Sequence, residues 1–250
     1  MGANDNGSTP LTFPGLKKEE AHVWRSNLDR ITARGAEYSH SADERARADK
    51  FHFQRDRSRF LAGRGVLRRL LAHYLDTSSA QIKFAVNAHG KPELKSNPHS
   101  LRFNISHSRN QALFAFCFER DIGVDIEWAR PDLDAQKILR LANRFFTTSE
   151  SHTLSTLEEA ARRAAFFRLW TRKEALLKAI GTGVAGGLSQ YEISLLAGEK
   201  PQILAPTDEA KLWSLFDLQV EAEYSGALAV RIEDASNFAV QSWDFDKACE

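Results

Sequence analysis

The clearest alternation of apolar and polar residues runs from Leu101 to Glu127, and it predicts two buried strands joined by a tight connection. The first strand carries polar side chains to its end, namely Asn104, Ser106 and His107. In the last strand, apolar residues alternate with Asp125 and Glu127. Side chains two positions apart on a strand share a face, so these two carboxylates lie about 7 Å apart at the backbone and can converge on one hard cation such as Mg²⁺.

The remaining periodicity predicts helices and short strands on both sides of this stretch. Before it we expect a strand from His22 to Leu28, helices from Asp43 to Lys50 and from Phe60 to Tyr74, a strand from Ile82 to Val86, and a turn from Asn87 to Pro92. After it we expect a helix from Ala135 to Asn143, a helix entry near Thr147, and a long helix from about Leu157 to Ile180. The segments Thr147 to Glu150 and Thr156 to Glu159 both match a capping box, and Gly181 is placed to end the long helix.

The end of the chain is predicted to be rich in β-structure. Alternation predicts strands at Tyr191 to Leu196, Gln202 to Leu204, Trp213 to Val220, Ala227 to Ile232 and Phe238 to Phe245. We interpret these as an antiparallel sheet against which the long helix packs. The glycine-rich segment Gly181 to Gly187 lacks the Gly-Lys-Ser/Thr of a phosphate-binding loop, so we expect a mobile turn there.

Together these elements predict an α+β protein with two lobes, each a helix on a sheet. We expect a disordered tail over residues 1–20, an N-terminal half over residues 21–121 and a C-terminal half over residues 122–250. A chain of 250 residues is long enough for one compact body of this kind.

Composition narrows the class of function. The 34 basic and 33 acidic residues nearly cancel, so no global charge directs the chain to nucleic acid or to an anionic membrane. Two cysteines, Cys117 and Cys249, form neither a metal-binding spacing nor a disulfide framework, which fits a reducing cytosol. We find no signal peptide and no apolar stretch of membrane-spanning length. Function must therefore come from a local site.

The long helix supplies the first candidates for that site. Phe166, Trp170, Glu174 and Lys178 form one stripe at intervals of four residues. A Glu and a Lys one turn apart are most often a surface ion pair. If Glu174 instead joins Asp125 and Glu127, three carboxylates and a lysine suit Mg²⁺ and a phosphate group, whereas zinc and calcium lack their usual ligand patterns.

A basic segment supplies candidates for holding the phosphate. Its arginines and lysine are Arg45, Arg47, Lys50, Arg55, Arg57, Arg59 and Arg64. Most such residues lie on a solvated helix face, but a guanidinium group can also grip phosphate with two hydrogen bonds. Lys91 stands at the tip of a predicted turn, where a lysine is usually solvated.

Five motifs in the same order give the chain a resemblance to a known family. They are Gly90-Lys91-Pro92, Phe103-Asn104-Ile105-Ser106-His107-Ser108, Gly123-Val124-Asp125-Ile126-Glu127, Phe145-Phe146 with Glu150, and Trp170-Thr171-Arg172-Lys173-Glu174-Ala175 with Lys178-Ala179. Over about residues 22 to 240 the chain resembles the Sfp-type 4′-phosphopantetheinyl transferases. The resemblance implies two similar α+β halves in a pseudo-twofold relation, with coenzyme A bound between them.

The resemblance also implies an activity and a role for each matching residue. The 4′-phosphopantetheine arm of coenzyme A would move to a serine of an apo carrier protein, releasing adenosine 3′,5′-bisphosphate. Asp125, Glu127 and Glu174 would bind Mg²⁺, and Glu174, directly or through a metal-bound water, would serve as the base. Lys178 would neutralise or protonate the leaving phosphate. The residues implied to bind coenzyme A are Arg47, Arg59, Lys91, Ser106, His107, Asp125 and Lys178. His107 could instead be a structural histidine at the end of a strand.

Partners and alternatives follow from the same resemblance. Apo acyl, aryl or peptidyl carrier proteins are the expected acceptors, and a cytoplasmic monomer is the expected form. The carrier, its pathway and the range of acyl-coenzyme A donors are not determined by the sequence. A Mg²⁺-dependent nucleotide phosphohydrolase and a non-catalytic carrier-binding adaptor remain as alternatives.

Overall fold

The computed structural model describes residues 13–33, 40–87, 91–182 and 187–249. The first half contains β1 (Glu20–Asn27), α1 (Leu28–Ala33), α2 (Ala42–Ala48), α3 (Gln54–Tyr74), η1 (Ser79–Gln81), β2 (Phe84–Val86), β3 (Pro92–Leu94), β4 (Leu101–Ser108) and β5 (Gln111–Phe118). The second half begins with β6 (Ile122–Trp128), α4 (Ala135–Phe145), α5 (Thr148–Thr156), α6 (Glu159–Ile180), η3 (Leu188–Gln190) and β7 (Glu192–Ile193). It ends with β8 (Ile203–Ala205), α7 (Thr207–Ala210), β9 (Ser214–Asp217), β10 (Tyr224–Val230), β11 (Ala239–Asp244) and α8 (Phe245–Ala248).

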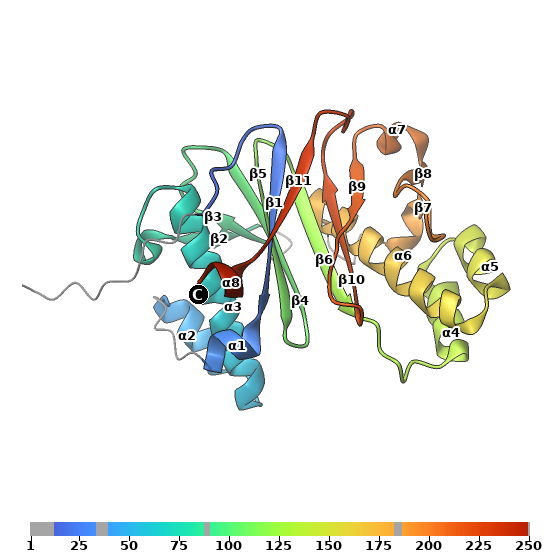
Figure 1. Cartoon of the computed structure of the whole chain (residues 1–250), viewed down its shortest axis with the longest axis horizontal. Helices are drawn as coiled ribbons and strands as arrows, with labels where there is room; N and C mark the ends of the chain where they lie inside the picture. The colour runs from blue at the N-terminus through green and yellow to red at the C-terminus, as the bar shows by residue number, and fades with distance from the viewer. Residues whose placement is uncertain (1–12, 34–39, 88–90, 183–186, 250) are drawn as a thin grey trace, which may run out of the picture.

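Two sheets pack face to face, and each carries a long helix on its outer side (Figure 1). The first sheet has the strand order β11-β1-β5-β4 and is covered by α3. The second has the order β6-β10-β9 and is covered by α6. The predicted α+β architecture, with a helix on a sheet in each half, is therefore confirmed.

Three apolar clusters hold these layers together. The first fills the space between α3 and its sheet, where Leu67, Leu70 and Leu71 pack near Trp24 and Phe116. A second cluster lies between the two sheets and contains Val23, Ala115, Val124, Leu228 and Val230. The third lies between α6 and the second sheet and includes Leu176, Ala179, Ala227 and Ala229. Because these side chains are almost fully buried, the two sheets are held in fixed register at the seam where the site lies.

Local signals explain where the C-terminal helices begin and end. Thr147 and Glu150 form the predicted capping box at the start of α5, with both reciprocal hydrogen bonds present. Gly181 ends α6 with a left-handed backbone (φ 89°), which glycine adopts without a Cβ penalty. The second predicted capping box is wrong, because α6 begins after Glu158 and no side chain caps it.

Other expectations differ from the structure. The stretch from Leu101 to Glu127 forms three strands rather than two, since the apolar segment Gln111–Phe118 is β5. The strand predicted at Phe238 to Phe245 was expected in the second sheet, yet β11 lies in the first sheet, parallel to β1. A local sequence pattern predicts a strand but not the strand with which it pairs. Here the end of the chain crosses back to the first sheet.

Some predictions fall partly or wholly on undescribed residues. Of the predicted tail, residues 1–12 lie outside the described residues, whereas Phe13 packs against Trp24, His73 and Phe245. Residues 183–186 of the predicted mobile turn, and Gly90 of the predicted lysine turn, also lie outside them. Within the described part of the chain, no helix has the length and apolar character needed to cross a bilayer.

Candidate active site

Strand β6 places Asp125 at the seam between the two sheets. Its side chain is only 3% exposed, and Oδ1 accepts hydrogen bonds from Ser106 Oγ at 2.8 Å and from Lys178 Nζ at 2.6 Å. The other oxygen, Oδ2, is buried and has no hydrogen-bond partner among the described residues. A buried carboxylate oxygen without a hydrogen-bond donor is costly, so this atom is available to bind a cation.

Helix α6 brings Glu174 and Lys178 to the same place because it packs directly on the backbone of β6. At Gly123, a Cβ atom would lie 2.1 Å from Ala175 O and 2.4 Å from Ala179 N, so only glycine permits this approach. Lys178 Nζ then reaches Ser106 Oγ at 2.9 Å as well as Asp125. Of the stripe predicted on the long helix, Lys178 contacts β6, whereas Phe166 and Trp170 pack with Phe146 after α4.

Electrostatic coupling connects Glu174 with the two acids on β6. Burial raises the pKa of Glu174 to about 7, and the charges of Asp125 and Glu127 act in the same direction while Lys178 opposes them. Burial, followed by the charge of Asp125, also raises the pKa of Glu127, whose Oε2 accepts from Ser108 Oγ at 3.0 Å. The charge of Asp125 thus disfavours the ionisation of Glu127 and Glu174, which is the situation that a divalent cation relieves.

Asp125, Glu127 and Glu174 fit a hard cation by their chemistry, although their side chains do not form a ready coordination cluster. In residues 13–33, 40–87, 91–182 and 187–249, no three His, Cys, Asp or Glu side chains form a ready metal cluster. The fit rests instead on the orphaned Oδ2 of Asp125 and on oxygen-only ligands, which Mg²⁺ prefers and completes with water and phosphate oxygens.

A cavity of about 350 Å³ adjoins these acids and brings four of the predicted phosphate ligands together. Arg47, Arg59, Ser106 and His107 all line it. The His107 side chain is exposed on one side. Partial desolvation by the surrounding protein lowers its pKa, and the positive charges of Lys178 and Arg59 act in the same direction. The wall is thus basic and polar beside Ser106 and apolar at Phe60, Phe84 and Phe114.

The two arginines of this cavity differ in their contacts. Arg59 forms a two-pronged ion pair with Asp29, at 2.7 and 2.6 Å, which holds its guanidinium group in place. Arg47 stacks over Phe60 at 5.4 Å from the ring centre and makes no ion pair with any described residue. Arg47 therefore retains its full hydrogen-bonding capacity for an anion.

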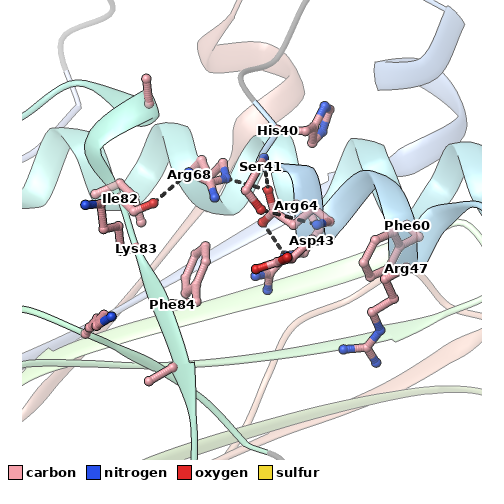
Figure 2. Close-up of a pocket in the computed structure, with 14 residues that line it drawn as sticks. His40, Ser41, Asp43, Arg47, Phe60, Arg64, Arg68, Ile82, Lys83 and Phe84 are labelled. Atoms are coloured by element: carbon pink, nitrogen blue, oxygen red, sulfur yellow. Dashed lines mark hydrogen bonds and ion pairs between the residues drawn. The ribbon is translucent and has the colours of Figure 1, made fainter.

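A larger cavity of about 620 Å³ lies on the other side of Phe84 and Arg64 (Figure 2). It shares Arg47, Phe60, Arg64 and Phe84 with the first cavity, but its wall lacks Ser106, the residue whose hydroxyl group connects the first cavity to Asp125. Figure 2 shows Arg68 pointing to the carbonyl of Ile82, and both Arg64 and Arg68 bind Glu44 at 2.8 Å. These two arginines therefore hold α2 against α3, and the smaller cavity is the one that borders Asp125 through Ser106.

Lys91 lies near the site but is directed to backbone. Its ammonium group donates to Ile122 O at 3.1 Å and to Lys178 O at 2.7 Å, and burial lowers its pKa. It therefore joins the start of β6 to the end of α6. An ammonium group has three donors, so one remains available for a phosphate oxygen.

Sequence reasoning missed several residues that support the site. Lys173, one position before Glu174, is fully buried with Glu150, and their side chains form an ion pair at 2.8 Å. Lys173 also donates to the carbonyls of Leu188 and Tyr191, so it fixes α6 against α5 and η3. The hydrogen bonds that Asn104 and Ser108 accept from the backbone of β6 were missed as well. The only signal available for these residues was their place in the quoted motifs.

Comparison with known proteins identifies the family. Residues 121–229 match the model of the 4′-phosphopantetheinyl transferase superfamily, and residues 29–119 match that of the 4′-phosphopantetheinyl transferase N-terminal region. The chain is 40% identical over 224 residues to 4′-phosphopantetheinyl transferase HetI of Nostoc, covering 86% of this chain and 89% of that protein. The chain belongs to the 4′-phosphopantetheinyl transferase superfamily. This confirms the predicted family, and the chain is a transferase that moves 4′-phosphopantetheine to carrier proteins.

Other relatives within the superfamily come from distant organisms. The psf-1 4′-phosphopantetheinyl transferase of Bacillus pumilus is 33% identical, covering 68% of this chain and 70% of that protein. The human L-aminoadipate-semialdehyde dehydrogenase-phosphopantetheinyl transferase is 30% identical, covering 78% of this chain and 68% of that protein. A holo-(acyl-carrier-protein) synthase from Bacillus anthracis in complex with CoA overlaps 44% of this chain and 94% of its own, at 20% identity and a TM-score of 0.34. That last overlap is too partial to bear on the assignment.

Proposed function

We propose that this phosphopantetheinyl transferase takes its donor from coenzyme A and performs the transfer with Mg²⁺ at Asp125, Glu127 and Glu174. The observation that carries the proposal is the buried, unpartnered Oδ2 of Asp125, next to two further acids whose pKa values are raised. When bound there, the ion would neutralise charge on the pyrophosphate of coenzyme A.

The adjoining basic cavity is proposed to hold the nucleotide part of coenzyme A. Arg47 and Arg59 would bind its 3′-phosphate, with His107 as a further donor on the rim and Ser106 beside it. Lys91 would add its one remaining donor to the phosphates. The surrounding protein lowers the pKa of His107, whereas a bound phosphate would act in the opposite direction and favour the protonated ring.

The acids and the lysine are proposed to move the proton and to stabilise the departing charge. Glu174 would take the proton from the carrier serine, directly or through a metal-bound water molecule. The serine oxygen would bond to the phosphorus next to the pantetheine, and the bond from that phosphorus to the bridging oxygen would break. Lys178 would neutralise or protonate the departing adenosine 3′,5′-bisphosphate, since its ammonium group lies at Asp125 and Ser106.

The remaining partners are proposed on the same basis. Apo acyl, aryl or peptidyl carrier proteins would be acceptors, in fatty-acid, polyketide or nonribosomal-peptide synthesis. A monomer in the cytoplasm is consistent with a site built within one chain and with free cysteines at positions 117 and 249.

Intact mass of an apo carrier tests the proposal. Incubated with coenzyme A and Mg²⁺, the protein should add one phosphopantetheine to the carrier, and Asp125→Ala should reduce the rate at least a hundredfold while carrier binding persists. Ser242→Ala, on exposed β11, serves as the matched control and should transfer at the normal rate. Consumption of coenzyme A without carrier would instead indicate a phosphohydrolase, and full activity of Asp125→Ala would defeat the metal assignment.

A further inference from the structure

Strands β4 and β6 meet at the seam without forming a backbone ladder. Each is the edge strand of its own sheet, in the orders β11-β1-β5-β4 and β6-β10-β9. The free N–H groups along the edge of β6 are bonded instead by side chains of β4. Val124 N donates to Asn104 Oδ1 at 2.9 Å, Ile126 N to Ser106 Oγ at 3.3 Å, and Trp128 N to Ser108 Oγ at 3.0 Å.

This arrangement repeats every two residues on both strands. Ser106 accepts from the N–H of Ile126 and donates to the carboxylate of Asp125, the residue just before it. Ser108 accepts from the N–H of Trp128 and donates to the carboxylate of Glu127, again the residue just before it. At the third step, Asn104 accepts from Val124, and the preceding residue is Gly123, which has no side chain to hold.

Each serine is therefore held at both ends. The strand N–H fixes the hydroxyl oxygen, so the hydroxyl proton has one favourable direction, toward the carboxylate. Hydrogen bonds to an ionised acceptor are stronger than neutral ones, and a carboxylate bonded in this way has a fixed rotamer. The spacing of the two serines on β4 thus sets the spacing of the two carboxylates on β6.

We propose that Ser106 and Ser108 are positioning residues that hold Asp125 and Glu127 in the orientation for binding a divalent cation. The inference rests on the proposed metal site and adds two residues behind its ligands. Groups that orient metal ligands typically change metal affinity by 10 to 100 fold when removed. The serines would act through the carboxylates and not on the cation itself.

Ser108 is the better residue for a test, because Ser106 also contacts Lys178 and lines the nucleotide cavity. Among the described residues, the Ser108 hydroxyl has two hydrogen bonds, from Trp128 N and to Glu127 Oε2. Ser108→Ala removes both without leaving a buried charge, and Ser108→Thr keeps the hydroxyl on a residue that strands favour. Ser242→Ala on β11 is the matched control, since this serine is exposed.

Binding of Mn²⁺ to the full chain, followed by electron paramagnetic resonance, gives a readout independent of turnover. We expect Ser108→Ala to weaken Mn²⁺ binding about tenfold. Ser108→Thr should restore most of the affinity, and Ser242→Ala should leave it unchanged. The affinity for adenosine 3′,5′-bisphosphate without metal should not change, because Ser108 does not line the nucleotide cavity.

A double-mutant cycle with Glu127→Gln decides whether Ser108 acts through Glu127. The inference predicts that the double variant binds Mn²⁺ no more weakly than Glu127→Gln alone. Additive losses, or a loss in Ser108→Ala that follows a fall in melting temperature, would mean that the serine is merely structural.

Two outcomes distinguish the positioning role of the serines from the metal site itself. If Ser108→Ala binds Mn²⁺ normally while Glu127→Gln and Asp125→Ala bind it poorly, the positioning inference is overturned and the metal site stands. If all three variants bind Mn²⁺ normally, the proposed metal site itself is wrong, and the inference is lost with it.

Discussion

Two residues of the site, Glu127 and Glu174, lie where ionisation is unfavourable. Asp125 and Glu174 are 3% and 8% exposed, and the charges of Asp125 and Glu127 add to the effect of burial in raising the pKa of Glu174. One lysine among the described residues, Lys178, contacts Asp125 directly. Without a cation, the close placement of these acids therefore destabilises the folded protein, as is common at ligand-binding sites.

Replacing Glu174 should reveal that loss of stability. The folded-state pKa is about 7, above the ordinary value of 4.5, so the folded state holds the proton more tightly than the unfolded state does. Stability from this group therefore falls as pH rises from about 4.5 to about 7, and stays low above that. We expect Glu174→Gln to raise the free energy of unfolding by about 1–3 kcal/mol at pH 8 without divalent cations.

Urea unfolding of both proteins at pH 8 and pH 4 provides the measurement. At pH 4 the wild-type group is protonated in both states, so the two proteins should unfold alike. A gain of equal size at both pH values would show that burial of charge is not the cause.

At the scale of elements, close packing of α6 on β6 delivers Glu174 and Lys178 to the acids. The contact depends on Gly123, where an added Cβ would meet backbone atoms of Ala175 and Ala179. These backbone atoms cannot change rotamer as a flexible side chain can, so α6 must move away from β6 to make room for the added Cβ.

Gly123→Ala should therefore reduce activity more than stability. We expect a cost of about 1–3 kcal/mol in unfolding free energy. Transfer to an apo carrier should fall at least a hundredfold, because a shift of about 1 Å in catalytic groups has that effect. Gly226→Ala is the matched control on neighbouring β10, since its Cβ would first meet the side chain of Val220 at 3.1 Å. Equal losses of activity in both variants would contradict the role given to the α6–β6 contact.

The elements show which parts of the structure sequence can predict. Periodicity and caps are local, and so the strand with Asp125 and Glu127, the helix with Glu174 and Lys178, and the stop at Gly181 were predicted. The bonds from Asn104 and Ser108 to β6 were not, because they join edge strands of two different sheets. The Lys173–Glu150 pair was missed for a similar reason: charged residues on a helix usually face solvent, and only the packing of α5 against α6 buries this one.

At the scale of the whole molecule, the chain closes on itself. Strand β11 returns to lie parallel to β1, and Trp243 stacks on Trp24 with ring centres 5.3 Å apart. Phe245, at the start of α8, is fully buried among the residues under α3, and in Figure 1 the C-terminus lies beside these first-half elements. The last residues of the second half thus complete the core of the first.

Phe245→Ala should therefore destabilise the whole protein. Removing a fully buried phenylalanine typically costs about 3–5 kcal/mol. Thermal unfolding should show one transition at a much lower temperature, without a separate early step for the C-terminus. Phe53→Ala is the matched control, because Phe53 is 62% exposed and its loss should leave the transition nearly unchanged. An unshifted transition in Phe245→Ala would contradict the closure.

The central claim is that three acids from two elements meet at one divalent cation. A crystal structure with Mn²⁺ and coenzyme A, read from the anomalous scattering of manganese, tests it most directly. We expect one strong anomalous peak within bonding distance of the carboxylates of Asp125, Glu127 and Glu174 and of the coenzyme A pyrophosphate. A peak elsewhere, or a Glu174 carboxylate turned away from the ion, would contradict it.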